Sequence, residues 1–458
     1  MFTGSIGKIK MNNPTTFNSN KKIKKNYALI NPIIVNPKTN MEKKGCVLIK
    51  NGLIEDFGDH ININEIEKNY LQIDCKNLYV CPGIIDIRAQ IREPGLEHQE
   101  TIKSASKSAS SGGITSLVCM PNTNPVVDQP AIIHTIQRKA REVALTKIHC
   151  TGCITRNLEG KEICELQLMH ESGAVGFTDG IKSLSNARVM RRALKYVKSF
   201  DGLIIQHPEE PSLSSEGVMN EGEISTRLGL KGIPNFAEPM IIERDLWLVR
   251  ETDSRYHVNH VSTEASVEII RKAKKEGLKI TCDTSPPYFT LNEMSVENYR
   301  TFAKLSPPLR PESDRLAIIK GLQDGTIDAI VSDHSPQDQD AKRLPFSQAE
   351  YGSVGLETLL SLTLKLFHNT SLSLIKSLAL ITCNPSKVIG LNTGEIKKNE
   401  EADLIVFDLY KPWKVDPNLF YSKSKNTPFD GMLLEGKNLM TFVKGRLVFD
   451  NTLSLIHI

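Results

Sequence analysis

The chain has 458 residues, and a typical domain of roughly 100 to 200 residues predicts two or three domains with a large hydrophobic core. Its composition, 40% hydrophobic and 24% charged, is ordinary for a globular protein, and no apolar run approaches the ~18 residues of a membrane span. The net charge is +4, but six lysines within the first 25 residues carry +6 and leave about −2 on the remainder. We therefore expect neither a membrane protein nor a nucleic-acid-binding surface on the folded part.

The N-terminal segment, residues 1–25, is rich in Asn, Lys, Ser and Thr. It lacks the Arg-rich amphipathic pattern of a transit peptide and the apolar core of a signal peptide. We expect a disordered tail, with a binding arm as the alternative.

The nine cysteines are scattered, and several stand in apolar runs such as "TSLVC" and "LKITC". This placement favours free buried thiols in a reducing compartment, and hence a cytoplasmic protein. The close pair in "CTGC", Cys150 and Cys153, is a weak zinc or redox motif because no second pair with metal-ligand spacing accompanies it.

The two ends of the chain share one pattern. Residues 26–82 and 394–458 contain short alternating strands with Gly and Asn turns, for example "KGCVLIKNGLIEDFG" and "NLMTFVKGRLVFD". We predict a small β-sandwich domain assembled from both ends, with residues 83–393 inserted between them.

In residues 83–393, nearly continuous apolar runs alternate with helical patterns; the runs include "GIIDI", "TSLVCM", "GLIIQH" and "DAIVSDH". Continuous runs indicate strands buried on both faces, and therefore a parallel sheet with helical crossovers. The stretch "STEASVEIIRKAKKEG" shows one such helix, with Ser262 or Thr263 as N-cap and Gly277 as stop. Over about 300 residues this α/β pattern favours a closed (β/α)8 barrel of the TIM type over an open sheet.

Polar residues that follow the predicted strands are the natural functional positions of such a fold. They are Asp86, Asn122, Asp179, His207, His260 and Asp333. Taken singly, Asp179 could be a turn or helix-cap residue, and Asp333 with His334 a capping pair. Taken together, two histidines and a carboxylate make the three-ligand set of a catalytic zinc site, with a second carboxylate to move a proton.

Several long motifs resemble class I dihydroorotases of the amidohydrolase superfamily. They include "PGIIDIRAQIREPGLEHQE", "GAVGFTDG", "MNEGEISTRLGLKGIP", "SPPLRPESDR", "DAIVSDHSPQD" and "SKNTPFDG", and the resemblance spans about residues 26–450. It implies a metal-dependent barrel of the amidohydrolase type with a β-sandwich built from both termini, in agreement with the layout above.

The resemblance also implies roles for individual residues. Asp179, His207 and His260 match metal ligands, and Asp333 matches a further ligand that acts as general acid and base. Arg92 and Asn122 match the pair that binds the substrate carboxylate, which favours dihydroorotate over hydantoin-like rings that lack one. A guanidinium fork and an amide donor suit a carboxylate chemically.

The chain departs from the family at other ligand positions. Arg88 and Gln90 replace the two histidines of the His-x-His motif, "SPPY" (285–288) replaces "TPHH", and Gln337 and Ser306 replace a histidine and an asparagine. Arg88 has no lone pair for a metal and stays protonated. It could act as a substitute cation for a metal, or turn away and leave room for one zinc ion at most.

We therefore weigh two functions of different classes. The first is a non-catalytic scaffold in pyrimidine biosynthesis, an oligomeric partner of aspartate transcarbamoylase. The alternative is an active dihydroorotase with a single zinc ion, which interconverts N-carbamoyl-L-aspartate and dihydroorotate. Another cyclic-amide hydrolase acting on a small carboxylate is a third possibility.

Overall fold

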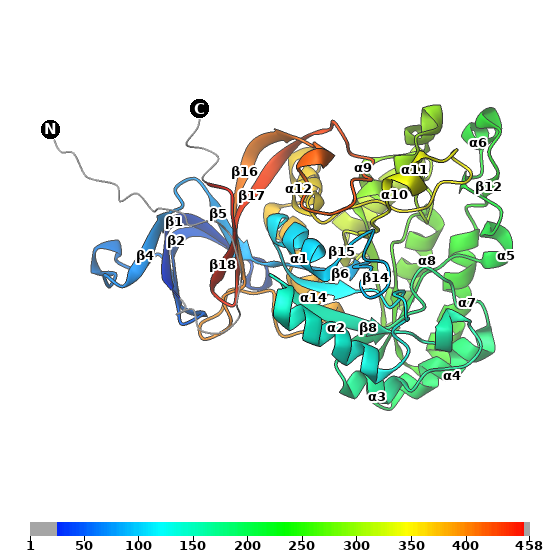
Figure 1. Cartoon of the computed structure of the whole chain (residues 1–458), viewed down its shortest axis with the longest axis horizontal. Helices are drawn as coiled ribbons and strands as arrows, with labels where there is room; N and C mark the ends of the chain where they lie inside the picture. Colours follow the sequence, from blue (N-terminus) through cyan, green and yellow to red (C-terminus); the bar gives the residue numbers. More distant parts are fainter. Residues whose placement is uncertain (1–24, 453–458) are drawn as a thin grey trace.

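The computed structural model describes residues 25–452, so the predicted tail, except for Lys25, lies outside the described residues. A β/α barrel and a β-domain lie next to each other along the long axis of the molecule (Figure 1). None of the helices formed by the described residues is long and apolar enough to cross a membrane.

The barrel contains eight parallel strands in the order β15-β14-β13-β10-β9-β8-β7-β6. They are β6 (Ile84–Ala89), β7 (Ile114–Cys119), β8 (Lys147–Gly152), β9 (Ala174–Phe177), β10 (Leu203–Gln206), β13 (Arg255–Val258), β14 (Ile280–Thr284) and β15 (Ala329–Ile330). The first and last strands meet where Gln90 N donates to His334 O at 2.8 Å and Ala89 bridges His334. We call this junction, residues 84–92 and 329–337, the seam. The predicted barrel is confirmed.

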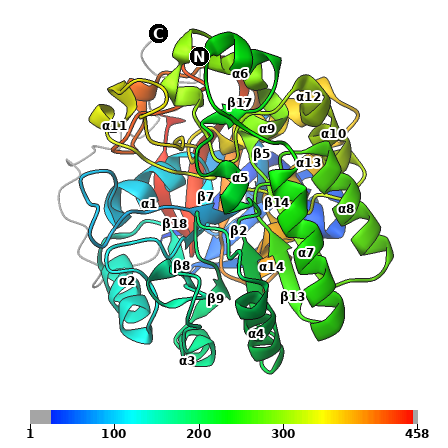
Figure 2. The ribbon, with the colours of Figure 1, turned by 90° about the vertical axis from the view of Figure 1, so that its right-hand side faces the viewer.

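The helices that connect the strands cover the outside of the barrel (Figure 2). They are α1 (Ile102–Ser111), α2 (Pro130–Val143), α3 (Leu166–Glu171), α4 (Ala187–Lys198), α7 (Ala237–Thr252), α8 (Glu264–Lys275), α10 (Glu312–Gln323) and α12 (Leu359–Asn369), followed by α13 (Leu374–Ala379) and α14 (Cys383–Ile389). α8 is built as its sequence predicts: the Thr263 side chain accepts a hydrogen bond from Ser266 N, and Gly277 is left-handed after the last turn. Val267, Ile270 and Ala273 form its buried face.

Shorter elements lie in the loops between these strands and helices. They are α5 (Pro211–Ser214), β11 (Met219–Asn220), α6 (Glu223–Leu228), β12 (Gly232–Ile233), α9 (Pro286–Thr290) and α11 (Gln339–Arg343).

The barrel strands are buried on both faces, as their apolar runs predict: every residue of β6, β7 and β10 is buried. β9, β13 and β14 each contain one partly buried residue, and β8 departs furthest from the pattern. Its first half, with Lys147 and His149, is only partly buried, and Lys147 pairs with Asp403 and Glu401 of the β-domain. This strand has no continuous apolar run and is absent from the strands singled out in the sequence.

The β-domain is one eight-stranded sheet drawn from both parts of the chain. The N-terminal part supplies β1 (Asn26–Asn36), β2 (Met41–Lys50), β3 (Leu53–Gly58), β4 (Tyr70–Asp74) and β5 (Tyr79–Pro82), and the C-terminal part supplies β16 (Leu404–Lys414), β17 (Leu433–Val443) and β18 (Arg446–Asp450). The two parts meet where β5 pairs with β16, with Cys81 opposite Ile405. A β-domain assembled from both chain ends is therefore confirmed.

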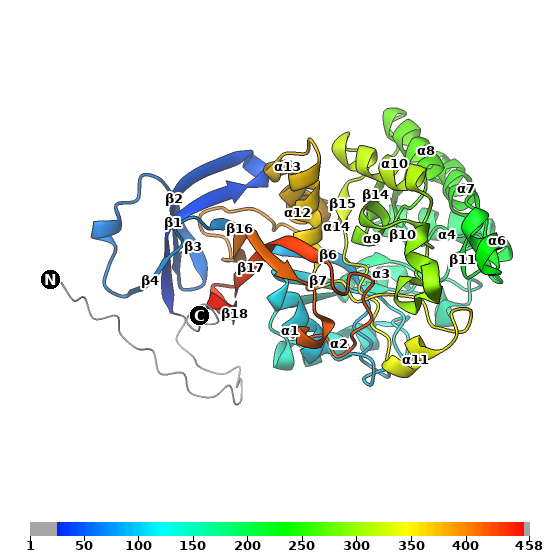
Figure 3. The same ribbon diagram turned by 90° about the horizontal axis from the view of Figure 1, so that it is seen from above.

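The connection between β16 and β17, residues 415–432, leaves the sheet and reaches the barrel (Figure 3). Val354 N, in the loop before α12, donates to Asn426 O at 2.8 Å. This segment therefore contacts the barrel on the side of the seam.

Candidate active site

The candidate residues lie at one rim of the barrel because each follows a parallel strand at its carboxyl end. Gln90 and Arg92 follow β6, Asn122 follows β7, and Asp179 follows β9. His207 follows β10, His260 follows β13, and Asp333 follows β15.

Three of these residues adopt a left-handed backbone that non-glycine residues rarely take. The φ angles are +60° at Arg92, +36° at His260 and +47° at Asp333. Such conformations cost roughly 1–3 kcal/mol each and persist where the surrounding structure fixes them, often at functional sites. Because these three residues carry predicted functional side chains, their strained backbone supports this rim as the candidate active site.

Arg88 and Asp333 form an ion pair at the seam. Arg88 is only 2% exposed, and its Nε donates to Asp333 Oδ1 at 2.7 Å. Arg88 Nη1 lies 2.6 Å from the amide oxygen of Asn259, whose amide nitrogen lies 3.3 Å from Asp283 Oδ2. Arg88 therefore does not turn away from the rim, as one interpretation of the sequence allowed, but contacts the predicted acid-base residue directly.

The ionisation of Asp333 follows from this contact. Burial alone would raise the pKa of its carboxyl group, but the charges of Arg88 and His260 outweigh that effect and lower the pKa to about 2. Asp333 is therefore a carboxylate at any pH near neutrality.

The two candidate histidines lie side by side. His207 Nδ1 is 2.9 Å from His260 Nε2, and His260 Nδ1 is 3.5 Å from Asp333 Oδ2. Burial, together with the neighbouring His260 and Arg88, lowers the pKa of His207 well below its ordinary value. His207 is therefore neutral at physiological pH, and its imidazole can share a proton with His260.

Asp179 uses its carboxylate within the protein. Oδ1 accepts from the backbone N–H groups of Ile154 and Thr155, both at 2.9 Å, and Oδ2 accepts from Thr155 Oγ1 at 2.5 Å. Asp179 and His207 line the same cavity of about 470 Å³, but the carboxylate already accepts three hydrogen bonds from the protein. This geometry makes Asp179 an anchor of the loop after β8.

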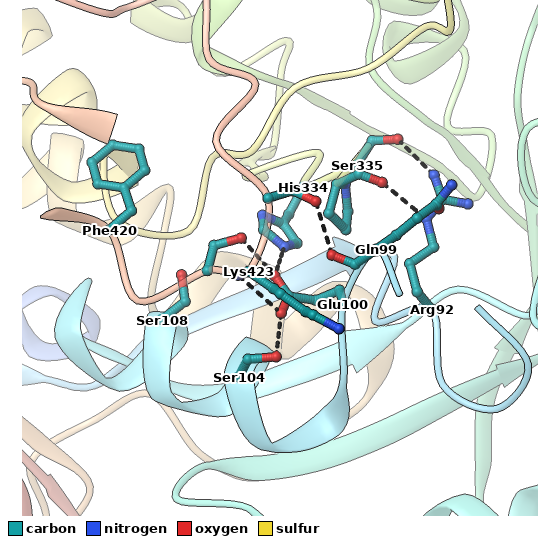
Figure 4. Close-up of polar contacts among 12 residues, drawn as sticks. Arg92, Gln99, Glu100, Ser104, Ser108, His334, Ser335, Phe420 and Lys423 are labelled. Atoms are coloured by element: carbon teal, nitrogen blue, oxygen red, sulfur yellow. Dashed lines mark hydrogen bonds and ion pairs between the residues drawn. The ribbon is translucent and has the colours of Figure 1, made fainter. Parts of the chain in front are cut away.

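The two residues matched to carboxylate binding lie on neighbouring strands. Arg92 Nε donates to Pro336 O at 3.3 Å and Nη2 to Ser335 Oγ at 3.4 Å (Figure 4). Burial lowers the pKa of Arg92 to about 10, which leaves it charged near neutral pH. The Asn122 side chain donates to Gln90 Oε1 at 3.0 Å.

Zinc does not fit this arrangement. Within residues 25–452, no group of three His, Cys, Asp or Glu side chains is disposed to hold a metal ion. A divalent ion ~5 Å from the Arg88 guanidinium would be repelled by roughly 7 kcal/mol at an effective dielectric near 20. In place of a metal ion, the positive charge beside the Asp333 carboxylate is the guanidinium of Arg88.

Two other departures from the family pattern have local partners. Gln337 Nε2 donates to Tyr351 O at 2.8 Å, and Tyr288 Oη donates to Pro307 O at 2.8 Å. Both side chains are buried and take part in packing the loops of the rim.

Sequence reasoning missed several supporting residues. Asp283 accepts from His260 N at 2.5 Å and lies 2.9 Å from His257 Nε2, so it fixes the left-handed turn at His260. Asp86, grouped above with the functional positions, instead accepts from Ser332 N at 3.0 Å and joins β6 to β15. Strand alternation in "HVNH" separates His257 from His260, but it does not reveal their shared contact with Asp283.

The chain is similar in sequence to known proteins of one family. The family model described as "Dihydro-orotase-like" matches residues 78–266. The chain is 43% identical over 424 residues to the dihydroorotase of Ehrlichia chaffeensis, with 92% of this chain and 94% of that protein covered. It is 42% identical over 416 residues to the dihydroorotase of Geobacter sp. (strain M21), with 91% and 97% covered.

The fold has solved counterparts. The structure superposes on the L-hydantoinase (dihydropyrimidinase) from Arthrobacter aurescens with a TM-score of 0.83 at 25% identity, covering 93% of this chain and 96% of that one. The dihydropyrimidinase from Brevibacillus agri gives a TM-score of 0.80 at 20% identity, which shows the shared fold alone.

Proposed function

Because the chain belongs to the dihydroorotase-like family, we propose that it acts in pyrimidine biosynthesis and interconverts N-carbamoyl-L-aspartate and dihydroorotate. Relatives named dihydroorotase match it over more than nine-tenths of both chains. The observation that carries the proposal is that one rim holds both a buried guanidinium without a carboxylate partner in the described part of the chain, Arg92, and an ionised carboxylate, Asp333.

Arg92 is suited to bind the substrate carboxylate. Its contacts with Pro336 O and Ser335 Oγ fix the direction of the guanidinium but use only two of its nitrogens. A guanidinium in a water-poor site binds a carboxylate strongly and in a defined orientation. This requirement favours dihydroorotate over cyclic amides without a carboxylate.

Asp333 is suited to move a proton. Hydrolysis of dihydroorotate joins the oxygen of water to a ring amide carbon and breaks the bond from that carbon to the ring nitrogen. The proton that water releases passes to Asp333 and then to the departing nitrogen. Because its pKa is about 2, Asp333 is a weak base, and we expect slow turnover.

One observation favours a second function. The Arg88–Asp333 ion pair lies at the seam side of the rim without a metal ligand set in residues 25–452, which supports a non-catalytic protein. In that case the chain serves as a scaffold, an oligomeric partner of aspartate transcarbamoylase.

An assay with purified protein separates the two functions. Cyclisation of N-carbamoyl-L-aspartate, and the reverse reaction, should be abolished by Asp333→Asn and unaffected by Asp340→Asn, an exposed carboxylate on α11. If the wild-type protein shows no turnover but co-elutes with aspartate transcarbamoylase, the scaffold function replaces the enzymatic one.

The cellular location is part of the same proposal. All nine cysteines are free thiols and eight of them are buried. Thiols without disulfides suit a reducing compartment, and we propose the cytoplasm.

A further inference from the structure

The segment between β16 and β17 holds the loop on which Arg92 depends. The Asn426 side chain is buried, and its Nδ2 donates to Ser335 O at 3.1 Å and to Gly352 O at 3.0 Å. Its Oδ1 accepts from Gln337 N at 3.1 Å. The Asn426 amide therefore forms hydrogen bonds with three backbone groups. Two of these, Ser335 O and Gln337 N, lie on either side of Pro336.

The contacts of Arg92 fall on the same short stretch. Its guanidinium donates to Pro336 O and Ser335 Oγ, the residues between the two backbone groups that Asn426 binds. The loop is tightly packed here, because a Cβ atom on Gly352 would lie 2.4 Å from Ser335 Oγ. A shift of this stretch would therefore redirect the guanidinium.

The buried carboxylate of Glu100 forms a second set of hydrogen bonds with the same segment. Glu100, before α1, is fully buried and accepts from Ser422 Oγ at 2.5 Å and from Lys423 N at 3.2 Å (Figure 4). Glu100 Oε2 also lies 3.5 Å from Nε2 of His334, the residue that follows Asp333. Burying a charge is costly unless several donors compensate it, and here the donors come from the segment and from Ser104 of α1.

We propose that residues 420–426 form a clamp in which Asn426 is a positioning residue for Arg92. The Asn426 amide fixes the stretch 335–337, and that stretch aims the Arg92 guanidinium at the substrate carboxylate. The inference rests on the proposed function, because it assigns the ligand of Arg92, but the clamp itself is a property of the free protein.

Asn426→Asp tests the clamp with little change in volume. It keeps an acceptor for Gln337 N, but it removes both N–H donors and places a carboxylate opposite two carbonyl oxygens. The matched control is Asn438→Asp, because Asn438 is also buried and its Nδ2 donates to Ser110 O and Ser111 O, at 3.4 and 3.1 Å, on α1. Both variants should have a lowered thermal midpoint.

Calorimetric titration with dihydroorotate measures the effect on the site. We expect Asn426→Asp to raise the dissociation constant about tenfold, because a misdirected guanidinium loses its bidentate geometry. The control should change it less than twofold. In an Arg92→Lys background the effect of Asn426→Asp should shrink to less than twofold, because residues acting through one another are not additive. Equal effects in both backgrounds would overturn the positioning role.

Hydrogen exchange tests the clamp without any ligand. Asn426→Asp should accelerate amide exchange at Ser335 and Gln337, the two residues of this stretch with an amide proton, and Asn438→Asp should not. If the wild-type protein fails to bind dihydroorotate, the proposed function fails while the exchange result still decides the clamp. Unchanged exchange at Ser335 and Gln337 would refute the clamp itself.

Discussion

The seam and the opposite side of the rim, near β9 and β10, treat their charged groups differently. At the seam, Arg88 contacts Asp333 and Asn259, and beside the seam Glu100 accepts hydrogen bonds from Ser422 and Lys423. Near β9 and β10, a cavity of about 470 Å³ lies between Asp179, His207 and Glu209. One buried oxygen of Glu209 has no hydrogen-bond partner among the described residues.

The two sides therefore differ in their structural role: one holds charged side chains in fixed contacts, and the other encloses open space. The seam pairs Arg88 with Asp333 and holds Arg92 through hydrogen bonds, so these groups are fixed before any ligand arrives. The β9–β10 side keeps room for water or for part of a ligand. If the comparison is correct, substitutions at the seam should lower the free energy of unfolding far more than substitutions of residues that face the cavity.

The largest effect should come from Arg88→Met. It leaves the carboxylate of Asp333, whose side chain is 19% exposed, without its cation, and breaking a largely buried pair in this way costs about 3–5 kcal/mol of unfolding free energy. Chemical denaturation measures the loss. The control is Arg191→Met, whose pair with Glu251 is 48% and 40% exposed and should contribute less than about 1 kcal/mol. Similar losses in both variants would contradict the distinction.

Restoring the two missing histidines should change the chemistry of the seam. Arg88→His with Gln90→His removes the repelling charge and adds two imidazoles beside His207, His260 and Asp333, which together suit zinc. Elemental analysis after purification with zinc should give about one ion per chain in the double variant and well below one in the wild type. Gln90→His alone, which keeps Arg88, should stay at the wild-type value. No uptake by the double variant would show that the changes at Tyr288 and Gln337 also reshape the site.

The two sides should lose stability in different pH ranges. The folded pKa of Asp333, about 2, lies below its ordinary value of 3.8, so its contribution is present above pH 4 and is lost as pH falls toward 2. By linkage, that shift corresponds to about 2–3 kcal/mol. His207 also has a lowered pKa, so the protein loses stability once pH falls below about 6.5, where the unfolded histidine binds a proton.

Thermal unfolding between pH 8 and pH 2 can resolve these ranges. The difference between wild type and Asp333→Asn should stay constant down to about pH 4 and then shrink, whereas the difference for His207→Gln should begin to change once pH falls below about 6.5 and keep changing as pH falls further. A single shared range would mean that the two sides titrate together.

The sequence predicts the barrel well because its strands are buried on both faces, so that apolar runs such as Ile84–Ile87 stand out. It fails at β8, where Lys147 pairs with residues far along the chain, in the β-domain. The site follows the same rule. Strand ends identify His207, His260 and Asp333, whereas Asn426 acts across 91 residues of sequence on Ser335, a contact that no local pattern encodes.

The position of Arg88 shows a further limit of the sequence. Its chemistry excludes a role as ligand, but the sequence cannot say whether the side chain points at the rim or away from it. The fold determines the direction of the side chain, because its partners Asp333 and Asn259 follow two other strands, β15 and β13.

The smallest effect should come from the β9–β10 side. Ile181 lines the cavity and is 51% exposed, so Ile181→Ala removes few contacts and should change the free energy of unfolding by less than about 0.5 kcal/mol. The same substitution at the seam, Ile91→Ala, leaves a cavity at a fully buried position and should lower the free energy of unfolding by about 2–5 kcal/mol. Chemical denaturation of both variants compares one side chain in two settings. A cost above about 2 kcal/mol at Ile181 would mean that the cavity is closed by packing in solution, and the contrast between the two sides would then rest on charge alone.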